Sequence, residues 1–338
     1  MGAATLEEVA AIAKVSRATA ARALNGYGYV GEATGLRVRA AAERLGYQTN
    51  RVAQALRSGQ LPIIGFVPGD IQNPFFARIA HDIDVALRRH KYNVLIASSE
   101  ESTTQERQVL AGLRGLNTQG LILAPASTKD FGHILDLVRD GMPIVLIDRL
   151  VRSVACDSVT VDNEAGAWDA VQHLVEMGHR KIAFLGDRTP IFTTEERLSG
   201  YRKALSAHGI SYERGLVVTA RSSVQDAIEA TVRLFRRRVR PTALLTVDSI
   251  MTQGALLGLR SLGIAIPQDV SLIGFDDFDL ATFTDPPITV VAQPTAEIGR
   301  LAAQLLLERL AQRDLKPRSV RFPTKLVRRG SVRQLGTE

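Results

Sequence analysis

A long alternation of apolar runs and helical patterns, spanning residues 63–275, constrains the fold more than any other feature of the chain. The predicted strands are residues 63–67, 92–97, 121–123, 144–147, 182–185, 216–219, 243–247 and 270–275. The predicted helices are residues 74–90, 104–113, 131–139, 168–177, 196–208, 224–236 and 250–262, followed by a helix at 296–310 and strands near 320–322 and 325–327. Continuous apolar strands alternating with helices are typical of parallel α/β sheets covered on both faces. So many strands favour two lobes, divided near residues 159–163, over one very large sheet. No internal sequence repeat is apparent.

The first 25 residues predict two short helices joined by a tight turn. The first helix repeats apolar residues at helical spacing, and Ser16 is a suitable N-cap for the second. We expect Ala20 and Leu24 to face inward. The residues predicted to face outward are Arg17, Ala18, Ala21 and Arg22. Two such helices are typical of the helix-turn-helix, whose second helix lies in the DNA major groove. An ordinary helical hairpin is the alternative.

A third helix is predicted over residues 32–45, ended by Gly46. Its expected inner face consists of Leu36, Val38, Ala42 and Leu45. Residues 50–57 suggest a further short helix, and the Gln-Leu-Pro sequence at 60–62 marks a domain boundary. An isolated helix this short is marginal in water, because nucleation is costly. It therefore needs a partner for its stability.

Charge and cysteine content limit the function classes. The net charge is +7, and residues 1–60 contribute +4 of it, which is typical of a module that binds a polyanion. The single cysteine, Cys156, excludes a disulfide framework, and we expect it to be a small buried residue in a reducing compartment. No secretion signal or membrane-spanning run is apparent, so we expect a cytoplasmic, nucleoid-associated protein with no membrane partner.

Eight motifs follow one another along nearly the whole chain: TLEEVAAIAKVSRATAARALNG, RVRAAAERLGYQTNRVAQALRSG, IIGFVP, NPFF, MGHRKIAFLGD, ERLSGYRKAL, IPQDVSLIGFDD and PPITVVAQPTAEIGRLA. Together they resemble the lactose/galactose-repressor (LacI/GalR) family. The resemblance implies an all-α helix-turn-helix headpiece (1–49), a hinge helix and linker (50–61), and a two-lobed, periplasmic-binding-protein-like core (62–338). One lobe would hold residues 62–160 and 291–322, and the other 161–290 and 323–338.

The resemblance also implies the partners. They are double-stranded operator DNA of pseudo-palindromic sequence and a small, sugar-like effector bound between the lobes. Family members are usually dimers. This chain ends in QLGTE without the leucine heptads that make some members tetramers, so we expect a homodimer.

Arg17, Ala18 and Arg22 match base-reading positions of the family. An Arg fork fits the two acceptors on the major-groove edge of guanine, and such a pair contributes about 1–3 kcal/mol of discrimination. Positions that match backbone-contacting residues are Thr5, Ser16, Thr19 and Asn25, whose alternative role is helix capping and turn formation. Two residues depart from the family. Ala21 replaces a common serine, and Lys14 replaces a turn glycine, which costs about 1 kcal/mol if φ is positive there.

Residues 50–57 match the hinge helix, which in the family forms on the operator and enters the minor groove. Its matching residues are Asn50, Val52, Ala53 and Leu56. Leu56 matches the leucine that wedges between base pairs and kinks the DNA, at an unstacking cost of about a few kcal/mol. The alternative is that Leu56 packs within the linker.

Six residues match effector-contacting positions: Phe75, Phe76, Asp148, Arg197, Asp248 and Asp276. Sugar sites combine carboxylates, guanidinium groups and an apolar ring face. Phe75 or Phe76 could equally belong to the core. Arg221 stands close to a position where the family often has an aromatic residue. We hypothesise that Arg221 with Arg197 favours an acidic or phosphorylated sugar; a solvated Arg221 is the alternative.

The sequence thus predicts an effector-controlled transcriptional regulator, with repression as the usual mode of its family. The alternatives are a sugar-active α/β enzyme and a sugar-binding transport protein. The chain has no Walker loop or nucleophile elbow, and its six histidines lack metal-ligand spacing, so we expect no catalytic residue, metal or cofactor. The basic headpiece argues against a transport protein. The sequence leaves open whether the effector releases or strengthens operator binding.

Overall fold

The computed structural model describes residues 4–25, 28–47, 62–187, 191–238 and 240–336. The chain divides into two compact units, Met1–Pro62 and Ile63–Glu338. The predicted hinge residues lie outside the described part: Asn50, Val52, Ala53 and Leu56. None of the helices in these ranges is long and apolar enough to cross a membrane.

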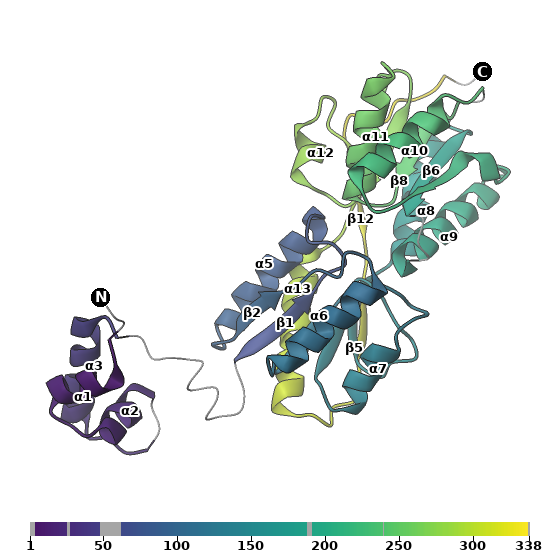
Figure 1. Cartoon of the computed structure of the whole chain (residues 1–338). Helices are drawn as coiled ribbons and strands as arrows, with labels where there is room; N and C mark the ends of the chain where they lie inside the picture. Colours follow the sequence, from purple (N-terminus) through teal and green to yellow (C-terminus); the bar gives the residue numbers. More distant parts are fainter. Residues whose placement is uncertain (1–3, 26–27, 48–61, 188–190, 239, 337–338) are drawn as a thin grey trace. The chain divides into compact units, whose positions relative to one another are not determined.

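In its described residues, the first unit is a bundle of three helices, α1 (Leu6–Ala13), α2 (Arg17–Asn25) and α3 (Glu32–Leu45) (Figure 1). Thr5 and Glu8 form a capping box at the start of α1, and Gly46 ends α3 in the left-handed conformation. The small core consists of Val9, Ala10, Ala13, Ala20, Val38, Ala41 and Ala42. This unit confirms the predicted helix pair and the third helix.

Two side chains of this bundle do not face as predicted. Ala21, expected on the outward face of α2, is only 4% exposed, so it fills space between the helices and does not offer a DNA contact. Leu36, expected in the core, is 58% exposed, and the inner face of α3 is made by smaller residues such as Ala41. A three-helix module this short needs close helix approach, which small side chains permit and a leucine would prevent.

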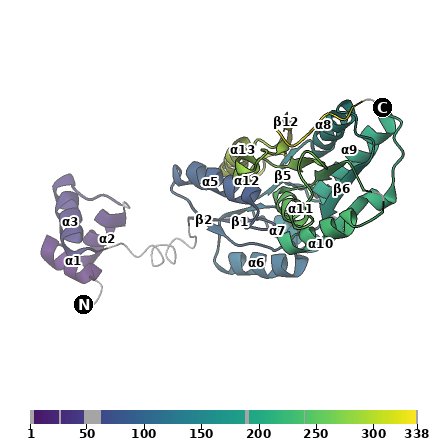
Figure 2. The ribbon, with the colours of Figure 1, turned by 90° about the horizontal axis from the view of Figure 1, so that it is seen from above.

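The second unit contains two sheets. The first has the strands β1 (Ile63–Val67), β2 (Asn93–Ile96), β3 (Gly120–Leu123), β4 (Ile144–Ile147), β5 (Asp157–Val161) and β11 (Ser319–Phe322). They are parallel, in the order β11-β5-β4-β3-β1-β2. One face carries α5 (Pro74–Arg88) and α13 (Thr295–Ala311), and the other α6 (Thr103–Gly115) and α7 (Gly132–Arg139) (Figure 2).

The second sheet has the strands β6 (Ile182–Asp187), β7 (Val217–Ala220), β8 (Ala243–Thr246), β9 (Ser271–Phe275), β10 (Thr289–Ala292) and β12 (Lys325–Val327). Their order is β12-β10-β9-β8-β6-β7, and only the β10–β12 pair is antiparallel. Its helices are α8 (Asn163–Glu176), α9 (Phe192–Ala207), α10 (Val224–Phe235), α11 (Ser249–Ser261) and the short α12 (Asp279–Phe283), with a 3-10 turn at Arg214–Leu216. We call the two halves the first lobe and the second lobe.

The lobes share one topology, which the sequence did not reveal as a repeat. The chain crosses between them three times, from β5 to α8, from β10 to α13 and from β11 to β12. Strands β5 and β10 were missed in the sequence, as was α12. Strand β5 contains the buried polar residues Asp157, Ser158 and Thr160, which break the apolar pattern expected of an inner strand.

Candidate functional site

The candidate DNA-binding surface is the outward side of α2. Arg17, Ala18 and Arg22 are all exposed there, as predicted for base-reading residues. Arg17 Nε lies 2.9 Å from Glu7 Oε1 of α1. Arg22 Nε donates to the carbonyl of Ala18, one turn back, at 3.3 Å. Arg17 is thus held by an ion pair and Arg22 by a hydrogen bond, and the terminal amino groups of both have no hydrogen bond to the described residues and are available for a guanine edge.

The predicted phosphate-contacting residues have local roles. Thr5 Oγ1 accepts from Glu8 N, and Ser16 Oγ accepts from Thr19 N at 3.1 Å. Asn25 Nδ2 donates to Ala21 O at 2.8 Å. The Thr5 hydroxyl still has a proton to donate to a phosphate, whereas the Ser16 and Thr19 hydroxyls share a hydrogen bond of 2.9 Å, so one of these two keeps a proton for a phosphate.

Lys14 has φ 54° and ψ 50°, the left-handed conformation that the turn requires. The condition stated for this position, a positive φ, is met, so a lysine there carries about 1 kcal/mol of backbone strain. Its exposed ammonium adds a cation directly before α2.

The candidate effector pocket lies between the lobes, at the carboxyl ends of the parallel strands, where ligands bind in open α/β sheets. It is lined by Asn73, Phe75, Phe76, Glu101, Asp148, Arg149, Asp187, Ile191, Thr193, Thr194, Arg197, Ser222, Asp248, Asp276 and Gln293. Its volume is about 30 Å³, roughly that of one water molecule. Pockets for small molecules are typically about 300–1,000 Å³, so the lobes must move apart to admit a sugar.

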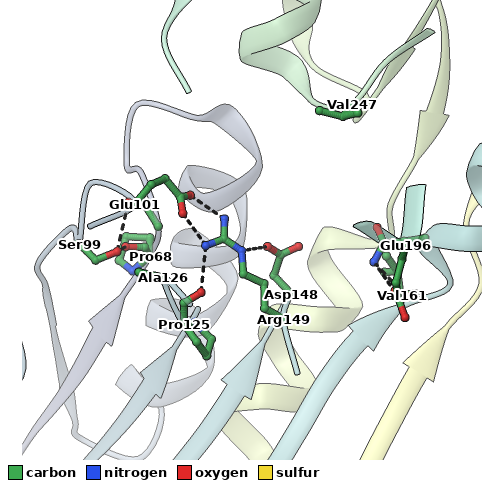
Figure 3. Close-up of polar contacts among 12 residues, drawn as sticks. Pro68, Ser99, Glu101, Pro125, Ala126, Asp148, Arg149, Val161, Glu196 and Val247 are labelled. Carbon is green, nitrogen blue, oxygen red and sulfur yellow. Dashed lines mark hydrogen bonds and ion pairs between the residues drawn. The ribbon is translucent and has the colours of Figure 1, made fainter. Parts of the chain in front are cut away.

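In the first lobe, the pocket is bounded by a buried ion-pair cluster (Figure 3). Arg149 directs its two terminal amino groups to the carboxylate of Glu101, at 2.5 and 2.6 Å, and one of them also to Pro125 O at 3.0 Å. Its Nε is 3.2 Å from Asp148 Oδ2. The Asp148 side chain is only 6% exposed and its backbone has φ 64°. The charge of Arg149 is thus neutralised by carboxylates of its own lobe.

In the second lobe, Arg197 is only 4% exposed but is held by neutral acceptors. Its Nε donates to Asn163 Oδ1 at 2.8 Å, and a terminal amino group donates to Val247 O. The guanidinium carbon lies 3.7 Å from the centre of the Phe275 ring. Asp148, Asp248 and Asp276 all act on Arg197 through space, although no direct ion pair joins them to it among the described residues. Its positive charge therefore faces the pocket.

Burial raises the pKa of each of these three carboxyl groups. The pKa of Asp248 rises to about 7 and that of Asp148 to about 6, with Arg149 and then Arg197 acting against the shift at Asp148. Burial likewise raises the pKa of Asp276, against the attraction of Arg197 and a hydrogen bond from Gln293. Titratable groups shifted into the neutral range cluster at functional sites.

Contacts between the lobes close the pocket along one edge. Ser249 Oγ, at the start of α11, donates to Asn73 Oδ1, the N-cap of α5, at 2.7 Å. One turn further along α5, Arg78 donates to Asp277 O at 2.5 Å and to Asp279 Oδ1 at 2.6 Å. These contacts join α5 of the first lobe to α11 and α12 of the second.

Phe75 and Phe76 line the pocket and also belong to the core of the first lobe, with ring centres 5.1 Å apart in an edge-to-face arrangement. The core alternative is thus confirmed for both residues, and a contact of either ring with an effector stays a prediction. Arg221 is different. Its side chain is 74% exposed, its Nε is 2.9 Å from Asp226 Oδ2, and it does not line the pocket. The structure thus places Arg221 as in the alternative stated for it, a solvated side chain, because the N-cap turn of α10 directs it to the acidic first turn of that helix.

Sequence reasoning missed Glu101, Arg149, Asp187 and Gln293 among the pocket residues. Asp187 ends β6, and Arg149 follows β4 by two residues. The rule that polar residues at the carboxyl ends of parallel strands meet at one edge would have found both. Glu101 and Gln293 carry no comparable signal. No group of three or more His, Cys, Asp or Glu side chains in the described ranges could hold a metal ion.

Comparison with known proteins decides the family. Residues 5–50 match the profile of bacterial regulatory proteins of the lacI family, and residues 171–332 match the periplasmic binding protein-like domain. The chain is 31% identical over 330 residues to catabolite control protein A of Priestia megaterium, covering 97% of this chain and 99% of that protein. It is 32% identical over 333 residues to the HTH-type transcriptional repressor CytR of Escherichia coli (strain K12), covering 98% and 97%. The chain belongs to the lacI family.

Among solved structures, the complex of the transcriptional regulator CelR with cellobiose is similar to this lacI-family chain. It has 31% sequence identity and a TM-score of 0.73, and the match covers 97% of this chain and 99% of that one. The helix-turn-helix headpiece and the periplasmic-binding-protein-like core are therefore those of a DNA-binding transcriptional regulator.

Proposed function

We propose that this lacI-family regulator is a repressor that binds a pseudo-palindromic operator as a homodimer, with α2 in the major groove. The observation that carries the DNA contact is the pair of exposed arginines, Arg17, held by an ion pair, and Arg22, held by a hydrogen bond through Nε. Ala18 offers an apolar contact, such as to a thymine methyl group. Thr5, Ser16, Thr19 and Asn25 donate to phosphates. Residues 50–57 complete the interface in the minor groove, with Leu56 as the wedge.

Fluorescence anisotropy with a duplex selected from a random pool tests this proposal. We expect affinity for the selected duplex to fall steeply with salt. Binding releases counterions from the DNA phosphates, and added salt opposes that release. Arg22→Ala should weaken specific binding far more than binding to a scrambled duplex. Equal losses on both would show that Arg22 contacts only phosphate. Failure to select any sequence would reject the proposal in favour of a plain sugar-binding protein.

The proposed effector is a neutral or amine-bearing, sugar-like molecule bound between the lobes. Glu101 already neutralises Arg149, so in the described part of the pocket three carboxyl groups, those of Asp148, Asp248 and Asp276, face the charge of Arg197. Carboxylates accept hydrogen bonds from sugar hydroxyls, whereas an acidic or phosphorylated sugar would meet net repulsion. The exposed position of Arg221 removes the main argument for an acidic ligand.

A thermal-shift screen with matched sugars tests the ligand class. Galactose, galactosamine and galacturonate differ mainly in charge, as do glucose, glucosamine and glucuronate. We expect the neutral or amine-bearing member to raise the melting temperature and the acidic member to leave it unchanged. Stabilisation by acidic sugars alone would contradict the proposed class.

The homodimer is supported by apolar side chains exposed on both lobes. Val85, Leu95 and Ile96 lie on α5 and β2 of the first lobe. Leu257, Leu280 and Phe283 lie on α11 and α12 of the second lobe, where Phe283 is 85% exposed beside a groove of about 900 Å³. Contiguous exposed apolar surface marks interaction sites.

Sedimentation should show a dimer that Phe283→Asp weakens, and a wild-type monomer would contradict the proposal. Such a dimer would act on chromosomal DNA in the cytoplasm.

A further inference from the structure

The ion pair between Glu7 and Arg17 is unusual for a surface that approaches DNA. Four acidic residues occur in residues 1–60, and one of them, Glu8, is used by the capping box of α1. Glu7 is not part of the capping box, although as an acid in the first turn of α1 it lies near the positive end of the helix dipole. Its side chain is 58% exposed and reaches from α1 to Arg17, the first residue of α2. A carboxylate at this place is repelled by DNA phosphates, so we expect a favourable effect of Glu7 that offsets this repulsion.

Glu7 and Arg17 form an ion pair. Its shortest distance is 2.9 Å, between Glu7 Oε1 and Arg17 Nε, and the Arg17 side chain forms no hydrogen bond to the described residues of the headpiece. A guanidinium has five N–H donors in a planar fork, and the terminal amino groups are the donors that pair with O6 and N7 of guanine. The ion pair therefore holds the guanidinium beside α1 without engaging the donors that read the base.

Arg22 provides an internal comparison. Its Nε donates to the carbonyl of Ala18 at 3.3 Å, so Arg22 is supported by its own helix. Arg17 is the first residue of α2 and has no helical turn before it that could offer such a carbonyl. The carboxylate of Glu7 on α1 attracts it instead. The two proposed base-reading arginines are thus supported by different means, one by a hydrogen bond and the other by an ion pair.

We propose that Glu7 is a positioning residue, which orients the Arg17 guanidinium for one base pair of each operator half-site and thereby sets the sequence preference at that position. This inference rests on the proposed DNA-reading role of α2. Glu7 lowers overall affinity through phosphate repulsion and raises discrimination by reducing the rotamers that Arg17 can adopt. The ligand of this contact is a G·C base pair.

The test uses the full-length protein, the duplex selected by it, and duplexes in which each base pair of the half-site is changed in turn. The variants are Arg17→Ala, Glu7→Ala, Glu7→Gln and the control Glu43→Ala, which removes an exposed acid from α3. Circular dichroism checks that each variant remains folded. Affinities are measured by anisotropy at one fixed salt concentration.

Arg17→Ala should lower discrimination at one base pair by about tenfold or more. Glu7→Ala should lower discrimination at the same base pair by about two- to fivefold, the range of an exposed ion pair, while raising affinity for scrambled DNA. Glu7→Gln keeps the shape of the side chain but removes its charge, so it should lower the discrimination as Glu7→Ala does. Glu43→Ala should leave the discrimination unchanged.

Three results would overturn the inference. Glu7→Ala could raise affinity for all duplexes equally, which would make Glu7 merely a repulsive charge. It could change the preference at a different base pair, which would make Glu7 a direct reader of a cytosine amino group. Arg17→Ala could leave discrimination intact, so that Glu7 has nothing to position. Failure to select any duplex is a separate outcome, because it rejects the proposed function itself.

Discussion

The two lobes of the core share one topology but use their buried arginines differently. In the first lobe, Arg149 forms a two-pronged ion pair with Glu101 and a contact with Asp148. In the second lobe, Arg197 is held by the amide oxygen of Asn163 and the carbonyl of Val247, which are neutral. Both side chains are about 95% buried. One arginine is therefore part of the structure of its lobe, and the other keeps its charge for the pocket.

The carboxylates show how far the likeness of the lobes extends. Asp148 follows β4 and Asp276 follows β9, and both have positive φ, at 64° and 73°. The amide of Asp148 donates to Val159 O of β5, and that of Asp276 to Val291 O of β10. The backbone of the two lobes thus repeats at the pocket, whereas the next residue differs, as Arg149 in one and Asp277 in the other. The two lobes therefore share the backbone arrangement, and the side chains placed on it determine whether a position has a structural or a binding role.

The largest effect is expected for Arg149→Ala. Removing this side chain leaves Glu101 buried without its partner, and breaking a buried pair costs about 3–5 kcal/mol. Urea unfolding of the full chain measures the free energy. The control is Arg107→Ala, which breaks the exposed pair with Asp130 in the same lobe and should cost about 1 kcal/mol or less. Equal effects of the two substitutions would refute the structural role of Arg149.

Arg197→Ala should mainly affect ligand binding. A hydrogen bond to a charged group contributes about 1.5–3 kcal/mol, so affinity for a sugar found in the thermal-shift screen should fall about tenfold to a hundredfold. The loss of unfolding free energy should be smaller than for Arg149→Ala, because no salt-bridge partner is left alone. Calorimetric titration measures the affinity. Undiminished affinity together with a large loss of stability would reverse the roles of the two arginines.

Asp248→Asn should change how stability depends on pH. The pKa of Asp248 is raised to about 7 by burial, so the folded state favours the protonated carboxyl. The contribution of the protonated Asp248 carboxyl to the free energy of unfolding is fully present below about pH 4 and is lost as pH rises through 7. Asparagine stays neutral and is an equally good N-cap for α11. The variant should therefore be more stable than wild type at pH 8, by about 1–2 kcal/mol, and equal to it near pH 4. A difference independent of pH would contradict the assignment.

The smallest effect is expected for the contact between the lobes at Arg78. Arg78→Ala removes two hydrogen bonds to the second lobe and should shift the population toward open lobes, by about 1 kcal/mol. Small-angle scattering of the full chain should show a larger radius of gyration. Arg88→Ala, which breaks a pair with Asp84 within α5, is the matched control. An unchanged scattering curve for Arg78→Ala would show that Asn73 and Ser249 suffice to hold the lobes.

Much of the architecture could be predicted from sequence, because the apolar strands and amphipathic helices carry their own periodicity. Strand β5 could not, since Asp157 is buried by partners distant in sequence: Arg309 at 2.8 Å and the amide of Arg318 at 2.7 Å. Helix spacing also failed to orient Ala21 and Leu36, because close packing of three short helices decides which side chains fit.

The pocket was predicted in part. Asp148, Asp248 and Asp276 follow strands, and Arg197 lies within a family motif, so local signals exist for each. Arg149 and Glu101 are 48 residues apart, and nothing in either segment indicates the pair. For Arg221, a local signal was misleading. The residue is close in sequence to the family position, but its Nε donates to Asp226 of α10 outside the pocket.

The central claim is that a ligand between the lobes controls the headpiece. The most direct measurement is the affinity of the full-length protein for its selected duplex, with and without the sugar found by thermal shift. We expect a change of about fivefold or more, in either direction, since allosteric coupling is typically about 1–3 kcal/mol. Arg197→Ala should abolish that change at the same sugar concentration while preserving binding to the duplex. A sugar that demonstrably binds between the lobes but leaves the DNA affinity unaltered would contradict the account.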